Sequence, residues 1–141
     1  MHIIVASGYF DPLHAGHVEY LAKARKLGDV LWVIVNNDEQ AKLKKGYSAI
    51  PEGDRVYIVS QLKPVDRVLL SIDSDGSVCE TLRVLMIEAA GHTITFAKGG
   101  DRYAGEIPEG KLGIPIVDGL GEKRDSSTRI NAVVPTSNTL L

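Results

Sequence analysis

The fold of this chain is decided by the run Ile3-Ile4-Val5-Ala6-Ser7-Gly8-Tyr9-Phe10-Asp11-Pro12-Leu13-His14-Ala15-Gly16-His17. Its first four residues are apolar and rich in β-branched side chains, which predicts a buried strand. The amphipathic stretch that begins near Gly16 predicts a helix. The turn between strand and helix carries two imidazoles, His14 and His17, spaced three residues apart. A strand, a short turn and a helix in this order are typical of a parallel α/β unit.

The same alternation continues along the chain. Five apolar runs have the length and composition of strands: Ile3–Ala6, Val30–Val35, Val68–Leu70, Ile94–Ala97 and Ile114–Val117. Three helical patterns lie between them: His17–Leu27, Pro51–Leu62 and Ser77–Ala90. We therefore predict an α/β, doubly wound (Rossmann-like) fold with a mainly parallel five-stranded sheet and helices on both faces.

The first predicted helix, His17–Leu27, shows how the helices should pack. Its pattern places Val18, Leu21 and Ala22 on one face, and Gly28 follows as an expected C-cap. In the later helices, Pro51 occupies an expected first-turn position and the single cysteine, Cys79, is expected to be half-buried.

Length and composition restrict the possible functions. The 141 residues predict one domain, 1–134, followed by a loosely held tail, 135–141. The net charge is −2 and the only basic run is Lys42–Lys45, so no nucleic-acid partner is expected. We also expect no membrane span, no signal peptide, no internal disulfide and a cytoplasmic location, because long apolar runs and paired cysteines are absent. The oligomeric state stays open, a homodimer included.

The turn before the first helix has the chemistry of an anion site. Unpaired N–H groups and the dipole at a helix start favour anions, and imidazoles can donate to phosphate oxygens. Gly8 and Gly16 allow close approach to a ligand, and Pro12 stiffens the turn. A single histidine at a helix start is usually a cap, but two histidines around a glycine predict a nucleoside triphosphate cradle.

Further candidates follow the other strands. The lysine-rich loop Lys42–Gly46 is either a solvated surface or a mobile clamp on phosphates. The segment Lys98-Gly99-Gly100-Asp101 is either a turn or a surface for a planar base. The segment Ser126-Ser127-Thr128 is either an ordinary N-cap or a second anion site.

The sequence His14-Ala15-Gly16-His17 resembles the His-x-Gly-His signature of the nucleotidyltransferase superfamily, cytidylyltransferase-like family. The resemblance includes glycerol-3-phosphate cytidylyltransferases and heptose-1-phosphate adenylyltransferases and extends to about residue 130. Further matching segments occur in the expected order: Ser7–Asp29, Val35–Asp38, Arg55, Leu62–Asp66, Lys98–Asp101 and Ser126–Thr128.

This resemblance implies roles for individual residues. His14 and His17 would contact the triphosphate and stabilise the transition state, and Lys42 and Lys45 would hold phosphates, with Lys44 as an alternative to Lys45. Asp38 and Arg55 would face the acceptor or order the loop that covers it. No protein ligand for a metal is predicted. Nucleotide contacts are implied for Gly8, Tyr9, Phe10, Asp11, Gly16, Gly99, Asp101, Ser126, Ser127 and Thr128.

The implied reaction is transfer of a nucleoside monophosphate to a small phosphorylated acceptor, such as a sugar or polyol phosphate, with release of pyrophosphate. Mg²⁺ is expected as cofactor, held mostly by the substrate. The base stays open between CTP and ATP. Glu122 stands where the cytidylyltransferase branch carries arginine, unless Lys123 or Arg124 substitutes, and Lys98–Asp101 is closer to the adenylyltransferase branch. The alternatives are a catalytically silent nucleotide-binding regulatory module and an interaction protein that uses the fold as a scaffold.

Overall fold

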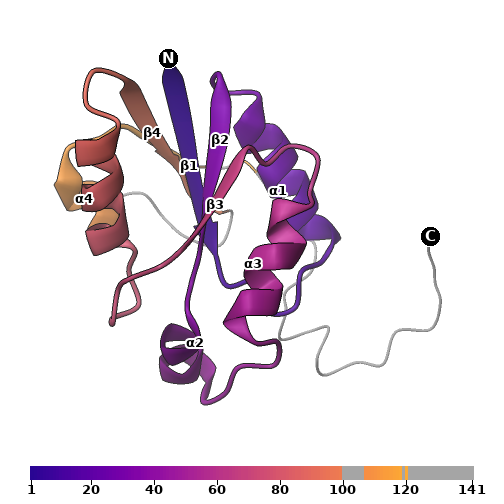
Figure 1. The fold of residues 1–141 in the computed structure, drawn as a ribbon. Coiled ribbons are helices and arrows are strands. Elements are labelled where there is room, and N and C mark those ends of the chain that lie inside the picture. The colour runs from indigo at the N-terminus through magenta and orange to yellow at the C-terminus, as the bar shows by residue number, and fades with distance from the viewer. Residues whose placement is uncertain (100–106, 119, 121–141) are drawn as a thin grey trace.

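The structure, a computed structural model, describes residues 1–99, 107–118 and 120. All five strands of its sheet are parallel, in the order β3-β2-β1-β4-β5 (Figure 1). The strands are β1 (His2–Gly8), β2 (Val30–Val35), β3 (Arg67–Leu70), β4 (Thr93–Ala97) and β5 (Ile116–Val117). The helices are α1 (Ala15–Arg25), α2 (Asp38–Lys45), α3 (Glu52–Ser60), α4 (Cys79–Glu88) and the 3₁₀ helix η2 (Pro108–Leu112).

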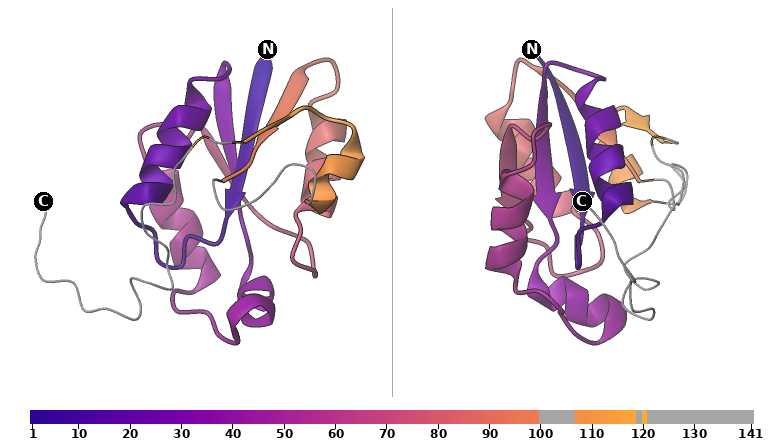
Figure 2. Two further views of the ribbon diagram at one scale, coloured as in Figure 1. Left: turned by 180° about the vertical axis from the view of Figure 1, so that it is seen from behind. Right: turned by 90° about the vertical axis from the view of Figure 1, so that its right-hand side faces the viewer.

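Alternate residues of β1 belong to two separate apolar cores, because side chains along a strand point to opposite faces of the sheet. Ile4 packs in a cluster that includes Leu21 of α1 and Val59 of α3. Ile3 packs in a second cluster with Leu82 of α4. Figure 1 shows α1 and α3 on one side of the sheet and α4 on the other, and the right-hand view of Figure 2 looks onto α1 and α3. The predicted doubly wound fold is confirmed.

The segment after β2 was predicted incorrectly. The lysine-rich stretch Lys42–Gly46 is the last turn of helix α2 and its cap, not a loop. The side chains of Asn37 and Gln40 form a reciprocal capping box at the start of this helix, and Gly46 ends it at φ 85°. The eight residues carry little apolar periodicity, so their helical pattern was hidden in the sequence. This helix lies beyond the carboxyl ends of the strands (Figure 1).

The predicted packing of α1 needs two corrections. Its buried residues are Tyr20, Leu21 and Ala24, whereas Val18 is 38% exposed. The helix ends at Arg25, so Gly28 is not its C-cap. A Cβ at Gly28 would lie 2.7 Å from the carbonyl oxygen of His2, and close packing against β1 therefore explains this glycine.

The remaining expectations were close. Pro51 is the N-cap of α3 rather than a residue of its first turn. Cys79 begins α4, is partly buried and forms no disulfide. The predicted last strand is shortened to Ile116–Val117. Within the described part of the chain, no helix is long and apolar enough to cross a membrane. The predicted tail, 135–141, lies outside the described residues.

Candidate functional site

The candidate site lies where the carboxyl ends of β1 and β4 meet. These two strands are neighbours in the sheet. After β1 the chain continues to β2, on one side of the pair, and after β4 it continues to β5, on the other side. Ligands of open α/β sheets bind at such a switch point. The hydroxyl of Tyr20 on α1 holds this junction together, because it accepts a hydrogen bond from the Ser7 N–H (3.4 Å) and donates one to the Ala97 carbonyl.

His14 and His17 form a compact pair at the start of α1. His14 is the N-cap, and its Nδ1 accepts a hydrogen bond from the Gly16 N–H (3.1 Å). His17 is the third residue of the helix, and its Nδ1 accepts from the His14 N–H (3.2 Å). The two rings stack with centroids 3.8 Å apart. The spacing of the two histidines is thus that of a reciprocal capping box, built here from imidazoles.

This capping arrangement fixes the hydrogen positions on the rings. A ring nitrogen that accepts a backbone N–H carries no hydrogen, so the neutral imidazole carries its hydrogen on Nε2. Burial lowers the pKa of His14, which keeps the ring neutral. Among the described residues, the Nε2 of His14 is the buried side-chain polar atom without a hydrogen-bond partner. Burying such a donor is costly, and a ligand oxygen would satisfy it.

Phe10 packs against the ring of His17. Its backbone φ is 51°, which is uncommon for a residue other than glycine, and its side chain is 2% exposed. The ring meets that of His17 edge-on, with centroids 5.1 Å apart. A Cβ at Gly8 would lie 2.8 Å from the Phe10 ring. Gly8 is therefore explained by packing of the turn on itself, and Phe10 offers a ligand little more than its backbone.

Asp11 is paired inside the protein. It is fully buried, and its carboxylate accepts hydrogen bonds from the N–H groups of Ala49 (3.0 Å) and Ile50 (2.7 Å). Lys45 lies 3.0 Å from the same carboxylate. Burial alone would raise the pKa of Asp11, but these contacts outweigh it and hold the pKa below its usual value. The Asp11 side chain therefore joins the turn to the α2–α3 segment, and its predicted nucleotide contact stays a prediction.

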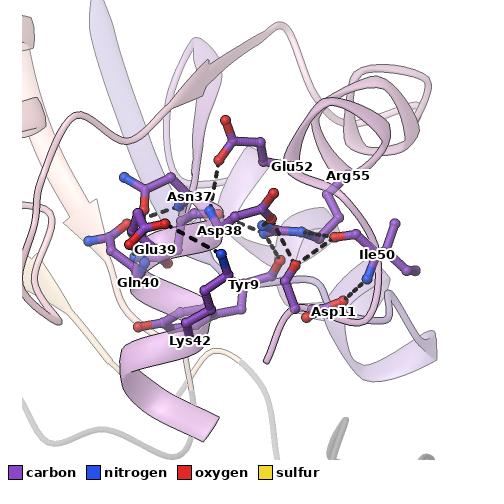
Figure 3. Close-up of polar contacts among 12 residues, drawn as sticks. Tyr9, Asp11, Asn37, Asp38, Glu39, Gln40, Lys42, Ile50, Glu52 and Arg55 are labelled. Carbon is purple, nitrogen blue, oxygen red and sulfur yellow. Dashed lines mark hydrogen bonds and ion pairs between the residues drawn. The ribbon is translucent and has the colours of Figure 1, made fainter. Parts of the chain in front are cut away.

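Arg55 has a similar internal role (Figure 3). It is fully buried on α3. Its guanidinium donates hydrogen bonds to four oxygens: those of the Ile50 (2.8 Å), Tyr9 (2.8 Å) and Asn36 (2.6 Å) carbonyls and the Asp38 carboxylate (2.7 Å). The guanidinium therefore holds the segment between α2 and α3 in place, and the predicted contact of Arg55 and Asp38 with an acceptor stays a prediction.

Asp38 connects this arginine to the start of α2. Its side chain also accepts a hydrogen bond from the Ser48 hydroxyl (2.7 Å), and its N–H donates to Glu52 (2.7 Å). Burial would raise the pKa of Asp38, but the hydrogen bonds from Ser48 and Arg55 lower it below its usual value. With 30% of its side chain exposed, Asp38 is the member of the pair that a ligand can reach.

The sequence comparisons agree with this geometry. The model of the cytidylyltransferase-like family matches residues 5–112. The chain belongs to the cytidylyltransferase-like family. It is 51% identical over 72 residues to an FAD synthase of Methanoregula boonei, a match that covers 51% of this chain and 48% of that protein. It is 37% identical over 107 residues to the bifunctional protein HldE of Nitratiruptor sp., covering 74% of this chain and 21% of that protein.

A solved structure supports the same family. The lipopolysaccharide core biosynthesis protein from Thermoplasma volcanium GSS1 matches with a TM-score of 0.70 and 32% sequence identity, covering 89% of this chain and 99% of that one. The chain spans about half the length of the curated FAD synthases that it matches. The resemblance predicted from the His-x-Gly-His sequence is thus confirmed at the level of the family.

The lysines of this family member differ in their surroundings. Lys45 is held by Asp11, whose carbonyl oxygen also accepts a hydrogen bond from its Nζ (2.8 Å). The Nζ of Lys44 lies 4.4 Å from the centroid of the Tyr9 ring. Lys42 is 58% exposed and pairs with Glu39 (3.5 Å) on the surface of α2. Lys44 and Lys45 therefore lie beside the β1–α1 turn.

The other predicted nucleotide contacts are only partly described. Lys98 is buried at the end of β4, and its Nζ donates to the Gly99 carbonyl (3.4 Å). Asp101, Ser126, Ser127 and Thr128 lie outside the described residues. No group of three or more His, Cys, Asp or Glu side chains that could hold a metal ion is found in the described part of the chain.

Two groups of residues near the site were not predicted from the sequence. Tyr20 was overlooked, although it lies one helical turn after His17. Asn37 and Gln40 were also overlooked, although their spacing in Asn-x-x-Gln is a capping-box signal that could have identified α2. Their tertiary hydrogen bonds had no signal in the sequence.

Proposed function

We propose that this protein is a nucleotidyltransferase that transfers a nucleoside monophosphate from a nucleoside triphosphate to the phosphate of a small acceptor. The proposal is carried by the buried, unpartnered Nε2 of His14 at the start of α1. This donor lies at the switch point of the sheet, and membership of the cytidylyltransferase-like family supports the same chemistry.

In this reaction an oxygen of the acceptor phosphate attacks the α-phosphorus in line. A new P–O bond forms while the bond to the β-phosphate oxygen breaks, and the electron pair leaves with pyrophosphate. A phosphate monoester is already nucleophilic at neutral pH, so no general base is needed. The protein must orient the reactants and stabilise the charge that develops on phosphate oxygens. The neutral imidazole of His14 can donate to such an oxygen without a change of protonation.

Mg²⁺ remains part of the proposal as an ion carried by the triphosphate. Asp11, three residues before His14, is fully buried and committed to Ala49, Ile50 and Lys45. Glu19, two residues after His17, pairs with Lys23 (3.7 Å) on α1. We therefore assign no protein ligand to the ion. Its contribution would be to neutralise charge on the phosphate oxygens.

We propose ATP as the donor and a flavin phosphate as the first acceptor to test. Seven curated relatives that are 42–51% identical over 72 to 75 residues are named FAD synthase. FAD is the product of joining an adenylyl group to FMN, so the name specifies both reactants. These relatives match about half of the present chain, and the acceptor is therefore the part of the proposal that most needs an experiment.

A phosphorylated sugar is the second candidate acceptor. It is favoured by the likeness to the Thermoplasma volcanium protein, whose name refers to lipopolysaccharide core biosynthesis and of which this chain covers 99%. The two candidates differ in the acceptor and not in the chemistry at the α-phosphorus.

Pyrophosphate release tests the proposal. We would combine ATP, CTP, GTP or UTP with Mg²⁺ and with FMN, sugar 1-phosphates or glycerol 3-phosphate, and use riboflavin as the control that lacks the attacking phosphate. We expect pyrophosphate with ATP and FMN and none with riboflavin. Release with ATP and a sugar phosphate alone would transfer the assignment to the second acceptor. Nucleotide binding without pyrophosphate from any pair would contradict the enzyme and favour a silent binding module.

A further inference from the structure

We infer that Asn37 and Gln40 are positioning residues that hold α2 against the segment between β3 and α4, here called the β3–α4 loop (residues 71–78). In doing so they place the lysines at the other end of α2 beside the β1–α1 turn. The inference rests on the proposed function, because it is the phosphates of the nucleotide that these lysines would meet.

Gln40 is fully buried, which is unusual for a glutamine. Its Nε2 donates to the carbonyl oxygens of Asp75 (2.6 Å) and Ser77 (2.8 Å) in the β3–α4 loop. Its Oε1 accepts from the Asn37 N–H (3.0 Å) and from the Asn36 side-chain amide (3.1 Å). The side-chain amide has two donors and two acceptor positions, and all four are used.

The two polar atoms of the Asn37 side-chain amide have different roles. Its Oδ1 accepts the Gln40 N–H (2.8 Å) and so caps α2. Its Nδ2 donates to the carbonyl oxygens of Ser71 (3.0 Å) and Asp73 (2.9 Å). The cap and the tether to the loop are therefore on different atoms and can be removed separately. Figure 3 draws Asn37 and Gln40 together at the start of α2.

The opposite end of α2 carries the cations. Lys45 contacts Asp11 (3.0 Å) and Lys44 lies over the Tyr9 ring (4.4 Å), and both partners belong to the β1–α1 turn. A helix of eight residues is too short to be stable by itself. Tethers to the β3–α4 loop at one end and to the turn at the other therefore set where the lysines lie.

Removal of the tethers should lower the fraction of molecules in which α2 is docked. A ligand that binds only when α2 lies against the β3–α4 loop then has a weaker apparent affinity, reduced in proportion to that fraction. Saturating ligand returns α2 to this position. The expected signature is a raised KM for ATP with a nearly unchanged kcat. A residue that only supports the fold would instead lower the melting temperature and both kinetic constants together.

The decisive variant is Asn37→Ser. Serine retains a side-chain oxygen that caps α2 but has no amide to reach Ser71 and Asp73. We expect the KM for ATP to rise roughly tenfold, equivalent to about 1.4 kcal/mol, and the melting temperature to stay close to that of the wild type. Gln40→Leu removes the second tether and also the acceptor for the Asn37 N–H, so we expect the same rise in KM for ATP together with a lower melting temperature. Gln61→Leu is its matched control, because Gln61 is exposed and its side-chain amide donates to the Ser60 hydroxyl (3.3 Å).

A second readout does not depend on activity. Trypsin cleaves after lysine only where the backbone opens locally, so cleavage after Lys42, Lys44 and Lys45, located by mass spectrometry, reports on α2. Without nucleotide, Asn37→Ser should be cut there faster than the wild type, and ATP with Mg²⁺ should slow the cut.

Unchanged cleavage and unchanged KM in Asn37→Ser would overturn the inference. Equal losses in kcat and in kcat/KM together with a lowered melting temperature would also overturn it, because they would indicate a structural role alone. If the wild type releases no pyrophosphate with any substrate pair, the proposed function fails. Trypsin cleavage of the free protein then decides separately whether Asn37 tethers α2.

Discussion

The β1–α1 turn (residues 8–17) and the segment that contains α2 and the start of α3 (residues 36–55) carry similar polar residues but use them differently. In the turn, the Nε2 of His14 is buried without a partner. In the second segment, fully buried Arg55 makes four hydrogen bonds within the protein. Residue type alone therefore does not distinguish a ligand contact from an internal one, whereas the unmet donor of His14 at the switch point is the group that we propose a ligand meets.

The largest effect is expected from substitution of Arg55 in the second segment, and it should appear in the free energy of unfolding. Arg55→Met leaves the carbonyls of Tyr9 and Asn36 and the Asp38 carboxylate without their donor. Each buried carbonyl left without its donor costs about 1–3 kcal/mol, so we expect a loss of about 3–5 kcal/mol in the free energy of unfolding measured with urea. Arg83→Met is the control, because Arg83 is 53% exposed on α4. A loss at Arg55 no greater than that at Arg83 would contradict the internal role.

The next largest effect is expected from substitution of His14 in the β1–α1 turn, and it should appear in the catalytic rate. His14→Asn keeps a side-chain acceptor for the Gly16 N–H, because asparagine is a good N-cap, but removes Nε2. We expect the rate to fall by about 10²–10³, the usual effect of losing one donor to a developing charge, with little change in melting temperature. His92→Asn, at the opposite end of the sheet, should leave the rate unchanged. Full activity of His14→Asn would remove His14 from the site.

A smaller effect on the free energy of unfolding should distinguish Lys45 from Lys42, which the sequence predicted to have the same role. Lys45→Met deprives the buried Asp11 carboxylate of its cation, and the cost should be about 1–3 kcal/mol. Lys42→Met removes an exposed pair with Glu39 and should change the free energy of unfolding by about 0.5 kcal/mol or less. Thermal melting with and without ATP checks both. Equal melting temperatures for the two variants would mean that the contact between Lys45 and Asp11 contributes nothing.

The smallest effect is a two-step dependence of stability on pH. The pKa of His14 is lowered in the fold, so its contribution is fully present above the unfolded value of about 6.5 and is lost as the pH falls toward the folded pKa. The pKa values of Asp11 and Asp38 are also lowered. Their contribution is present above about pH 4 and is lost below it.

Urea unfolding between pH 3 and 8 would resolve these two steps. In His14→Asn the decline that begins near pH 6.5 should be absent, while the decline below about pH 4 should remain. If the variant and the wild type lose stability in parallel across the whole range, the first step does not belong to His14.

Most of the fold could be predicted because the central strands are nearly continuous apolar runs. β1 and β2 are buried on both faces, and few structures other than a covered parallel sheet accommodate such runs. The helix α2 was missed for the opposite reason. It buries only Gln40 and Ala41, so no apolar stripe marks it, and it is held by side-chain amides instead.

The candidate site could also be predicted only in part from the sequence. His14 and His17 could be found because the helix start, the spacing and the local hydrogen bonds involve residues at most three positions apart. The roles of Asp11 and Arg55 could not, because their partners are up to 39 and 46 positions away in the chain. The sequence indicated that these residues matter, but it could not show that their side chains are held by partners within the protein.

The sequence alone was enough to predict the parallel sheet and the position of the histidine turn, because both follow from periodicity and short-range spacing. Its resemblance to the His-x-Gly-His signature also indicated the family. Only the tertiary structure decided which polar groups are used up inside the protein. Hydrogen bonds are satisfied in three dimensions, and a buried carboxylate such as that of Asp11 takes whichever donors the fold brings to it. The same packing left the Nε2 of His14 without one.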